Sequence, residues 1–124
     1  MSNLIAIAGG GALGALLRFW MSTSVYAMFG RDFPYGTLAV NVVGSFAMGI
    51  LFVLLDEKFS LAPEWRAALL IGLLGAFTTF STFSIETLNL MLSGETMKAL
   101  LNVVLSVMVC IMATWLGLLL GRQV

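Results

Sequence analysis

The chain has 124 residues, of which 60% are hydrophobic and 10% are charged, and its formal net charge at pH 7 is zero. A soluble domain of this length needs a polar exterior that this composition cannot supply, so the composition indicates an integral membrane protein. The balanced charge argues against a nucleic-acid partner. The chain has no His and a single Cys, which excludes intrachain disulfides and the usual zinc sites. It also leaves few groups for acid/base catalysis near neutral pH, so no enzyme activity is expected.

Four apolar stretches are long enough to span a bilayer, which takes about 20 residues. Short polar breaks separate them, and no internal repeat or low-complexity linker divides them, so we predict one domain over residues 1–124. The predicted fold is all-α, with spans at residues 4–29, 35–55, 65–92 and 99–120. No Lys or Arg precedes the first stretch and no cleavage pattern follows it, so we expect a retained span rather than a signal peptide.

The first span combines small residues with a charge. Gly10 and Gly14 form a GxxxG pair, and Arg18 lies one helical turn further on the same face. One interpretation is close helix packing, with Arg18 reaching an interface. The alternative is that Arg18 lies at a vestibule and concentrates anions there, since it cannot deprotonate.

In the second span a stripe of small and polar residues recurs every fourth position. Asn41, Ser45 and Gly49 share this face. The stripe is consistent with tight helix contact and hydrogen bonding between helices. The Asn41 amide also offers two N–H donors, which would suit a desolvated anion.

The third span contains a dense block of hydroxyl and phenylalanine residues, from Gly75 to Ser84, which does not suit a lipid-facing helix. Gly75 and Thr78 have poor helix propensity, so we predict a local break near the middle of the span. A break frees backbone carbonyls, which at membrane depth coordinate monovalent cations such as sodium. Beyond the break, Phe80 and Phe83 lie one turn apart and either pack in the core or line an anion path with their positive ring edges.

One carboxylate is set well inside a predicted span. Glu86 follows the hydroxyl-rich block by one turn. It either caps a polar cluster or pairs with a basic group near an interface, or it guides an ion at a pore end. The sequence leaves these readings open.

The fourth span carries a polar track. Asn102, Ser106, Cys110 and Thr114 recur at every fourth residue among apolar side chains. On a helix they form one winding stripe about 18 Å long. The stripe is either a pore wall or a set of helix contacts in which Ser and Thr hydroxyls bond to carbonyls one turn earlier.

An even number of spans places both termini on one side of the membrane. Lys58, Arg66 and Arg122 then lie on the terminal side, and Arg31 and Lys98 lie on the other. A bias this small allows either a fixed orientation or insertion both ways. Insertion both ways would let the chain pair with an inverted copy of itself, which is the symmetry that many transporters obtain from inverted repeats.

Three motifs identify a resemblance along the whole chain. They are Gly10-Gly11-x-x-Gly14-x-x-x-Arg18, Gly36-Thr37-Leu38-x-x-Asn41, and Gly75-x-x-Thr78-Thr79-Phe80-Ser81-Thr82-Phe83-Ser84. With these motifs the chain resembles the small bacterial fluoride channels, the Fluc or CrcB family. The third motif is the specific one.

The resemblance implies an antiparallel, dual-topology homodimer in the bacterial plasma (inner) membrane, with two fluoride pores and a central structural Na⁺ ion. The implied sodium ligands are the backbone carbonyls of Gly75 and Thr78. Arg18 and Glu86 would lie at a vestibule or pore end. The implied pore residues are Asn41, Phe80, Ser81, Thr82, Phe83, Ser106, Cys110 and Thr114, with Asn102 at a further step of the track, although Cys110 and Asn102 depart from the hydroxyl or aromatic residues usual there.

The function so implied is passive fluoride conduction, which lets a cell shed fluoride that enters as the neutral acid. An alternative is a small dual-topology, proton-coupled exporter of lipophilic cations. Such an exporter needs a carboxylate within its first span, where this chain has Arg18 instead. A third possibility is an accessory subunit whose polar stripes serve only for packing.

Overall fold

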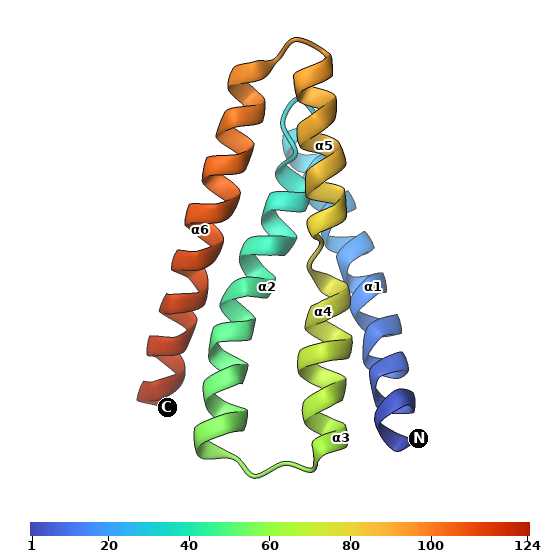
Figure 1. The fold of residues 1–124 in the computed structure, drawn as a ribbon, viewed down its shortest axis with the longest axis vertical. Coiled ribbons are helices and arrows are strands. Elements are labelled where there is room, and N and C mark those ends of the chain that lie inside the picture. Colours follow the sequence, from blue (N-terminus) through green and yellow to red (C-terminus); the bar gives the residue numbers. More distant parts are fainter.

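The fold is built from helices joined by short turns, without any strand. A computed structural model describes residues 1–124 (Figure 1). Four helical stretches are long and apolar enough to cross a membrane: Ser2–Phe29, Tyr35–Lys58, Pro63–Leu92 and Thr96–Gln123. The prediction of an all-α, multi-pass membrane protein is therefore confirmed. Each stretch runs up to three residues beyond its predicted bounds, because hydropathy marks only the apolar part of a helix and the added residues are mostly polar.

The first and fourth stretches are single helices, α1 (Ser2–Phe29) and α6 (Thr96–Gln123). In the second, α2 (Tyr35–Val53) continues into a π-helical turn, η1 (Leu54–Lys58). The third consists of α3 (Pro63–Arg66), the π-helical segment η2 (Ala67–Leu73), α4 (Leu74–Phe77) and α5 (Phe80–Leu92). Thr78 and Thr79, between α4 and α5, have extended backbone, with φ −89°, ψ 157° and φ −151°, ψ 117°.

Small residues bring α1 against the third stretch. A Cβ atom on Gly10 would overlap the carbonyl oxygen of Ala68, and one on Gly14 would overlap that of Leu73. The GxxxG pair thus allows backbones to approach closely, as such pairs do in membrane helices. This observation favours the packing interpretation for the two glycines.

Helices α2 and α6 cross in the same way. A Cβ on Gly49 would overlap the carbonyl oxygen of Thr114, and one on Gly117 would overlap that of Phe46. Gly49 is the last member of the predicted α2 stripe, so this stripe mixes packing and polar positions. The close crossing fixes the α6 polar residues beside α2.

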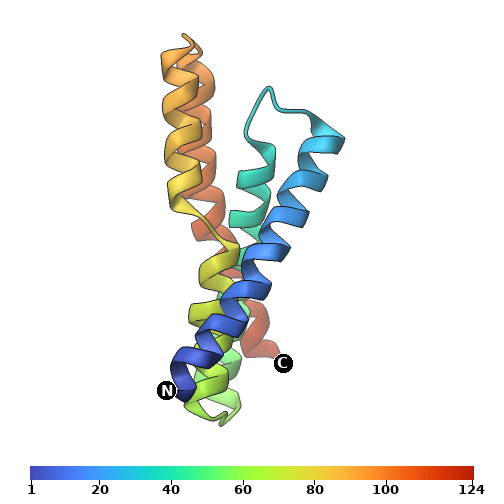
Figure 2. The same cartoon turned by 90° about the vertical axis from the view of Figure 1, so that its right-hand side faces the viewer.

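At the end that carries α5, the molecule divides into two arms (Figures 1 and 2). Figure 2 shows α5 and α6 side by side in one arm and the ends of α1 and α2 in the other. Both termini lie at the opposite end of the molecule (Figures 1 and 2). Most charged residues lie toward the two ends of the molecule, and six of them form three ion pairs: Arg66–Asp56 at 3.2 Å, Arg122–Glu57 at 3.8 Å and Lys98–Glu95 at 3.3 Å.

Candidate functional site

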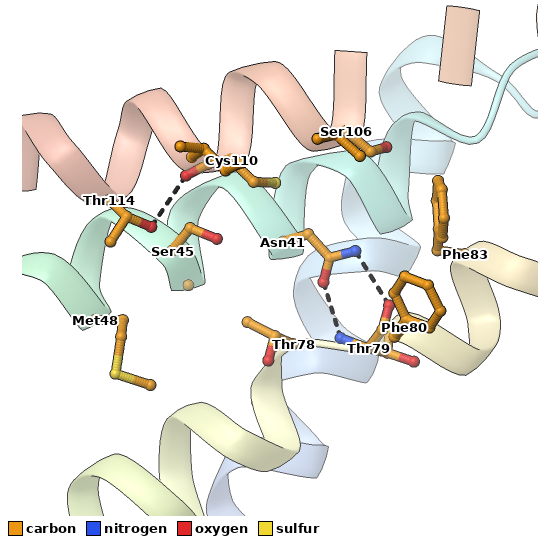
Figure 3. A pocket seen from close by; sticks show the side chains of 13 residues that line it. Asn41, Ser45, Met48, Thr78, Thr79, Phe80, Phe83, Ser106, Cys110 and Thr114 are labelled. Carbon is orange, nitrogen blue, oxygen red and sulfur yellow. Dashed lines mark hydrogen bonds between the residues drawn. The ribbon is translucent and has the colours of Figure 1, made fainter. Parts of the chain in front are cut away.

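A cavity of about 400 Å³ lies between α2, the third stretch and α6. No charged side chain lines it. Its polar and aromatic lining residues are Asn41, Ser45, Thr78, Thr79, Phe80, Phe83, Ser106, Cys110 and Thr114 (Figure 3). The fold therefore brings together six of the predicted pore residues: Asn41, Phe80, Phe83, Ser106, Cys110 and Thr114.

Asn41 holds the extended segment by two hydrogen bonds. Its Nδ2 donates to the Thr79 carbonyl at 3.1 Å, and the Thr79 N–H donates to its Oδ1 at 2.8 Å (Figure 3). The side-chain amide thus pairs with Thr79 as another peptide group would in a sheet. Because the amide has two N–H protons and this pair uses one, the other remains available to a ligand.

The same contacts leave two carbonyls without their usual helical donors. In a continuous helix, the Thr79 N–H would bond to the Gly75 carbonyl and the Thr82 N–H to that of Thr78. Here the Thr79 N–H bonds to Asn41, and the Thr82 N–H bonds to Thr79 Oγ1 at 3.2 Å. Gly75 and Thr78 are thus the residues whose carbonyl oxygens lose these helical partners.

Ser81 and Thr82 do not line the cavity, although both belong to the predicted pore set. The Thr79 hydroxyl caps the first turn of α5, donates to Thr82 Oγ1 at 3.1 Å and lies 3.4 Å from Ser81 Oγ. Their hydroxyls therefore organise the start of α5 within this chain. The sequence did not indicate this use because a helix N-cap and a pore wall favour the same residue types.

The two phenylalanines lie one above the other on α5. The Phe80 and Phe83 ring centroids are 5.3 Å apart and the rings are inclined by 46°. Both rings line the cavity, but Phe80 is 77% exposed in the single chain. The cavity wall is therefore open beside Phe80.

The α6 track contributes three of its four members to the cavity. Ser106, Cys110 and Thr114 line it, whereas Asn102 does not. Thr114 Oγ1 donates to the Cys110 carbonyl at 3.0 Å, and Ser106 Oγ donates to Asn102 Oδ1 at 3.4 Å. Each hydroxyl has one proton, so either side chain must turn from its present partner before it can donate to an ion.

A second cavity, of about 340 Å³, contains Glu86. The Tyr26 hydroxyl donates to Glu86 Oε2 at 2.8 Å and lies 3.3 Å from Thr37 Oγ1, which must donate in turn. The Arg31 guanidinium lies 4.4 Å from the centre of the Tyr26 ring. This contact was not predicted, because nothing in the sequence links Tyr26 to a carboxylate 60 residues away.

Arg18 and Glu86 were assigned together to a vestibule or pore end. Glu86 Oε1 is buried without a hydrogen-bond partner, and so is Arg18 Nε. Arg18 lines neither the main cavity nor the cavity of Glu86. The single chain thus leaves one unpaired polar atom on each of these two residues.

No cluster of three or more His, Cys, Asp or Glu side chains could hold a metal ion. The carbonyls of Gly75 and Thr78 are backbone oxygens without the two helical donors described above, and backbone carbonyls at unwound helices are the ligands that coordinate Na⁺ in membrane transporters.

Known proteins are similar to this chain along nearly its whole length. A protein from Methylococcus capsulatus named "Fluoride-specific ion channel FluC" is 58% identical over 121 residues, which are 98% of this chain and 53% of that relative. The chain thus spans about half the length of that protein. Proteins of the same name from Hydrogenovibrio crunogenus and Coxiella burnetii are 52% identical over 121 residues and 50% identical over 124 residues, covering 92% and 99% of those relatives.

The relatives are named as ion channels, which are not enzymes. The family model described as "CrcB-like protein, Camphor Resistance (CrcB)" matches residues 5–118. This match covers all four membrane-spanning stretches almost completely. The chain therefore belongs to the CrcB-like family.

Proposed function

We propose that this protein is a passive, fluoride-selective ion channel that exports cytoplasmic fluoride across the bacterial inner membrane and so reduces its toxicity. The observation that carries the proposal is the main cavity. It combines a free Asn41 N–H, phenylalanine rings and the hydroxyls of α6, with no charged side chain in its lining. Such neutral groups bind an anion at several weak sites, and weak binding permits rapid conduction. The relatives named as fluoride-specific channels supply the identity of the ion.

The functional unit in this proposal is an antiparallel, dual-topology homodimer with two pores. Phe80 lines the cavity yet is 77% exposed, so a single chain does not close the path at this ring. An inverted second copy would cover it and supply the second pore by symmetry. The slight charge difference between the two ends of the chain is compatible with insertion in both directions.

A structural sodium ion at the dimer centre belongs to the same proposal. The third span would act as a broken helix, and the carbonyls of Gly75 and Thr78 would hold the ion. Their fit rests on the loss of their usual helical donors, because the Thr79 N–H bonds to Asn41 and the Thr82 N–H bonds to Thr79 Oγ1. When bound, the ion would offset the partial negative charge of these carbonyl oxygens.

Sodium should stabilise the protein specifically. A ligand that binds only the folded state at 100 times its Kd adds about 2.7 kcal/mol to the free energy of unfolding. We therefore expect the melting temperature of the purified protein in detergent to rise with sodium concentration. N-methylglucamine at equal ionic strength is the control for screening. Equal melting temperatures in the two salts would contradict the sodium site.

Fluoride flux tests the proposed function directly. The purified protein is reconstituted in liposomes under a fluoride gradient, and efflux is followed with a fluoride electrode. We expect rapid fluoride efflux and, with the same vesicles under a chloride gradient, no chloride efflux above that of protein-free liposomes. A lack of fluoride efflux, or equal efflux of both anions, would refute the proposal.

The proton-coupled exporter remains the alternative to this proposal, but no observation favours it. It needs a membrane-embedded carboxylate in the first span, and α1 contains none. The one carboxylate within a span, Glu86, lies on α5 and accepts a hydrogen bond from Tyr26.

A further inference from the structure

The most deeply buried polar side chain of the molecule belongs to Asn102, which is 2% exposed. It lies on α6, one turn before Ser106, and its spacing had assigned it to the polar track. The structure separates it from the track, because the other three members line the main cavity and Asn102 does not. A buried amide away from the cavity requires its own explanation.

Asn102 forms the one side-chain hydrogen bond that joins α5 to α6. Its Nδ2 donates to Thr87 Oγ1 at 2.8 Å. Thr87 Oγ1 in turn donates to the backbone carbonyl of Phe83 at 2.7 Å. Asn102 is thus connected through a single hydroxyl to the turn of α5 that carries Phe83.

The protons in this chain of bonds have a fixed direction. The single proton of the Thr87 hydroxyl is directed to Phe83, so Thr87 can only accept from Asn102. This orientation turns Asn102 Oδ1 toward Ser106, whose hydroxyl donates to it at 3.4 Å. Asn102 is therefore linked to both walls of the cavity at this level. It bonds to Ser106 on α6 directly, and it is connected to Phe83 on α5 through the Thr87 hydroxyl.

We infer that Asn102 is a positioning residue that sets the distance between Phe83 and Ser106 across the ion path, rather than a group that touches the ion. This inference rests on the proposed function, since it concerns the same cavity. The bond to Thr87 holds α5 against α6 in the arm that stands apart from α1 and α2 (Figure 2). The weak, long bond from Ser106 leaves that hydroxyl free to turn toward an anion while its backbone stays in place.

A double-mutant cycle on fluoride efflux tests the inference. Asn102→Leu and Thr87→Val remove the two ends of the bond and keep the side-chain volumes similar. We expect each to slow efflux about tenfold and the double variant to be no slower than the worse single one, since the bond between Asn102 and Thr87 that each substitution removes can be lost only once. Thr87→Ser retains the hydroxyl and so keeps the hydrogen bond. Its efflux rate should therefore remain within about twofold of that of the natural protein.

Thr23→Val serves as the matched control, since Thr23 is exposed on α1 and the substitution is the same. Efflux from this variant should equal that of the natural protein. Two results would overturn the positioning role. One is a loss of efflux in the double variant equal to the product of the losses in the single variants, and the other is a Thr87→Ser variant as slow as Thr87→Val. Multiplicative losses would mean that Asn102 contacts the ion on its own account.

A second readout does not depend on which ion is conducted. Cys110, the only cysteine, lines the main cavity one turn beyond Ser106. If Asn102 holds α5 in place, Asn102→Leu and Thr87→Val should speed labelling of Cys110 by a small anionic thiosulfonate, by about threefold or more, as local opening becomes easier. Thr87→Ser should leave the rate unchanged.

The two readouts separate the possible failures. If the natural protein passes no fluoride, the proposed function fails, and Cys110 labelling then decides whether Asn102 positions the cavity. If fluoride flux is present but labelling is the same in all variants, the positioning role fails and the channel function stands.

Discussion

Replacing Asn41 with aspartate is expected to reduce fluoride efflux at least a hundredfold. The substitution keeps an acceptor for the Thr79 N–H but removes the amide protons, one of which bonds to the Thr79 carbonyl. It also places a negative charge in the cavity lining. Two unit charges 4 Å apart repel by about 4 kcal/mol at an effective dielectric constant of 20, and this energy corresponds to about a thousandfold in binding or rate.

The control for this variant is Asn3→Asp, which makes the same chemical change at an exposed position in the first turn of α1. It should conduct as the natural protein does. Size-exclusion chromatography of both variants separates a loss of conduction from a loss of folding. Efflux from a well-folded Asn41→Asp protein at the natural rate would show that the Asn41 amide does not face the ion.

The class of fold followed from composition and hydropathy, whereas the contacts within the site did not. The four apolar stretches were long and contained few charged residues, so their number and type were predictable. The pair formed by Asn41 and Thr79 was not, because it joins residues 38 apart through one side chain and one backbone group. Such pairing depends on how the helices cross, which a single sequence does not specify.

Residue type alone does not distinguish two uses that require the same chemistry. Ser81 and Thr82 looked like pore hydroxyls, yet both hydroxyls lie against Thr79 at the start of α5. Asn102 matched the spacing of the α6 track, yet it is buried against Thr87. A fourfold spacing places residues on one side of a helix but does not say whether they meet a cavity or a neighbouring helix.

The close approach of α2 to the extended segment makes Gly44 a sensitive position. A Cβ atom there would overlap Thr78 Cγ2 and lie 3.1 Å from Phe77 Cδ2. Thr78 cannot simply rotate, because its Oγ1 donates to the Leu74 carbonyl at 3.0 Å. We expect Gly44→Ala to lower the free energy of unfolding by about 1–3 kcal/mol, as overpacking does, and to slow efflux about tenfold or more through displacement of Thr78 and its neighbours.

A second substitution should reverse this effect. Thr78→Ser removes the Cγ2 methyl group that the new Cβ would meet and leaves the backbone carbonyl and the hydroxyl in place. The double variant Gly44→Ala/Thr78→Ser should therefore regain most of its efflux and melting temperature, while Thr78→Ser alone should behave as the natural protein. Gly9→Ala is the matched control, since nothing lies within 4 Å of a Cβ there. A double variant as impaired as Gly44→Ala would mean that the glycine is needed for something other than the approach of Thr78.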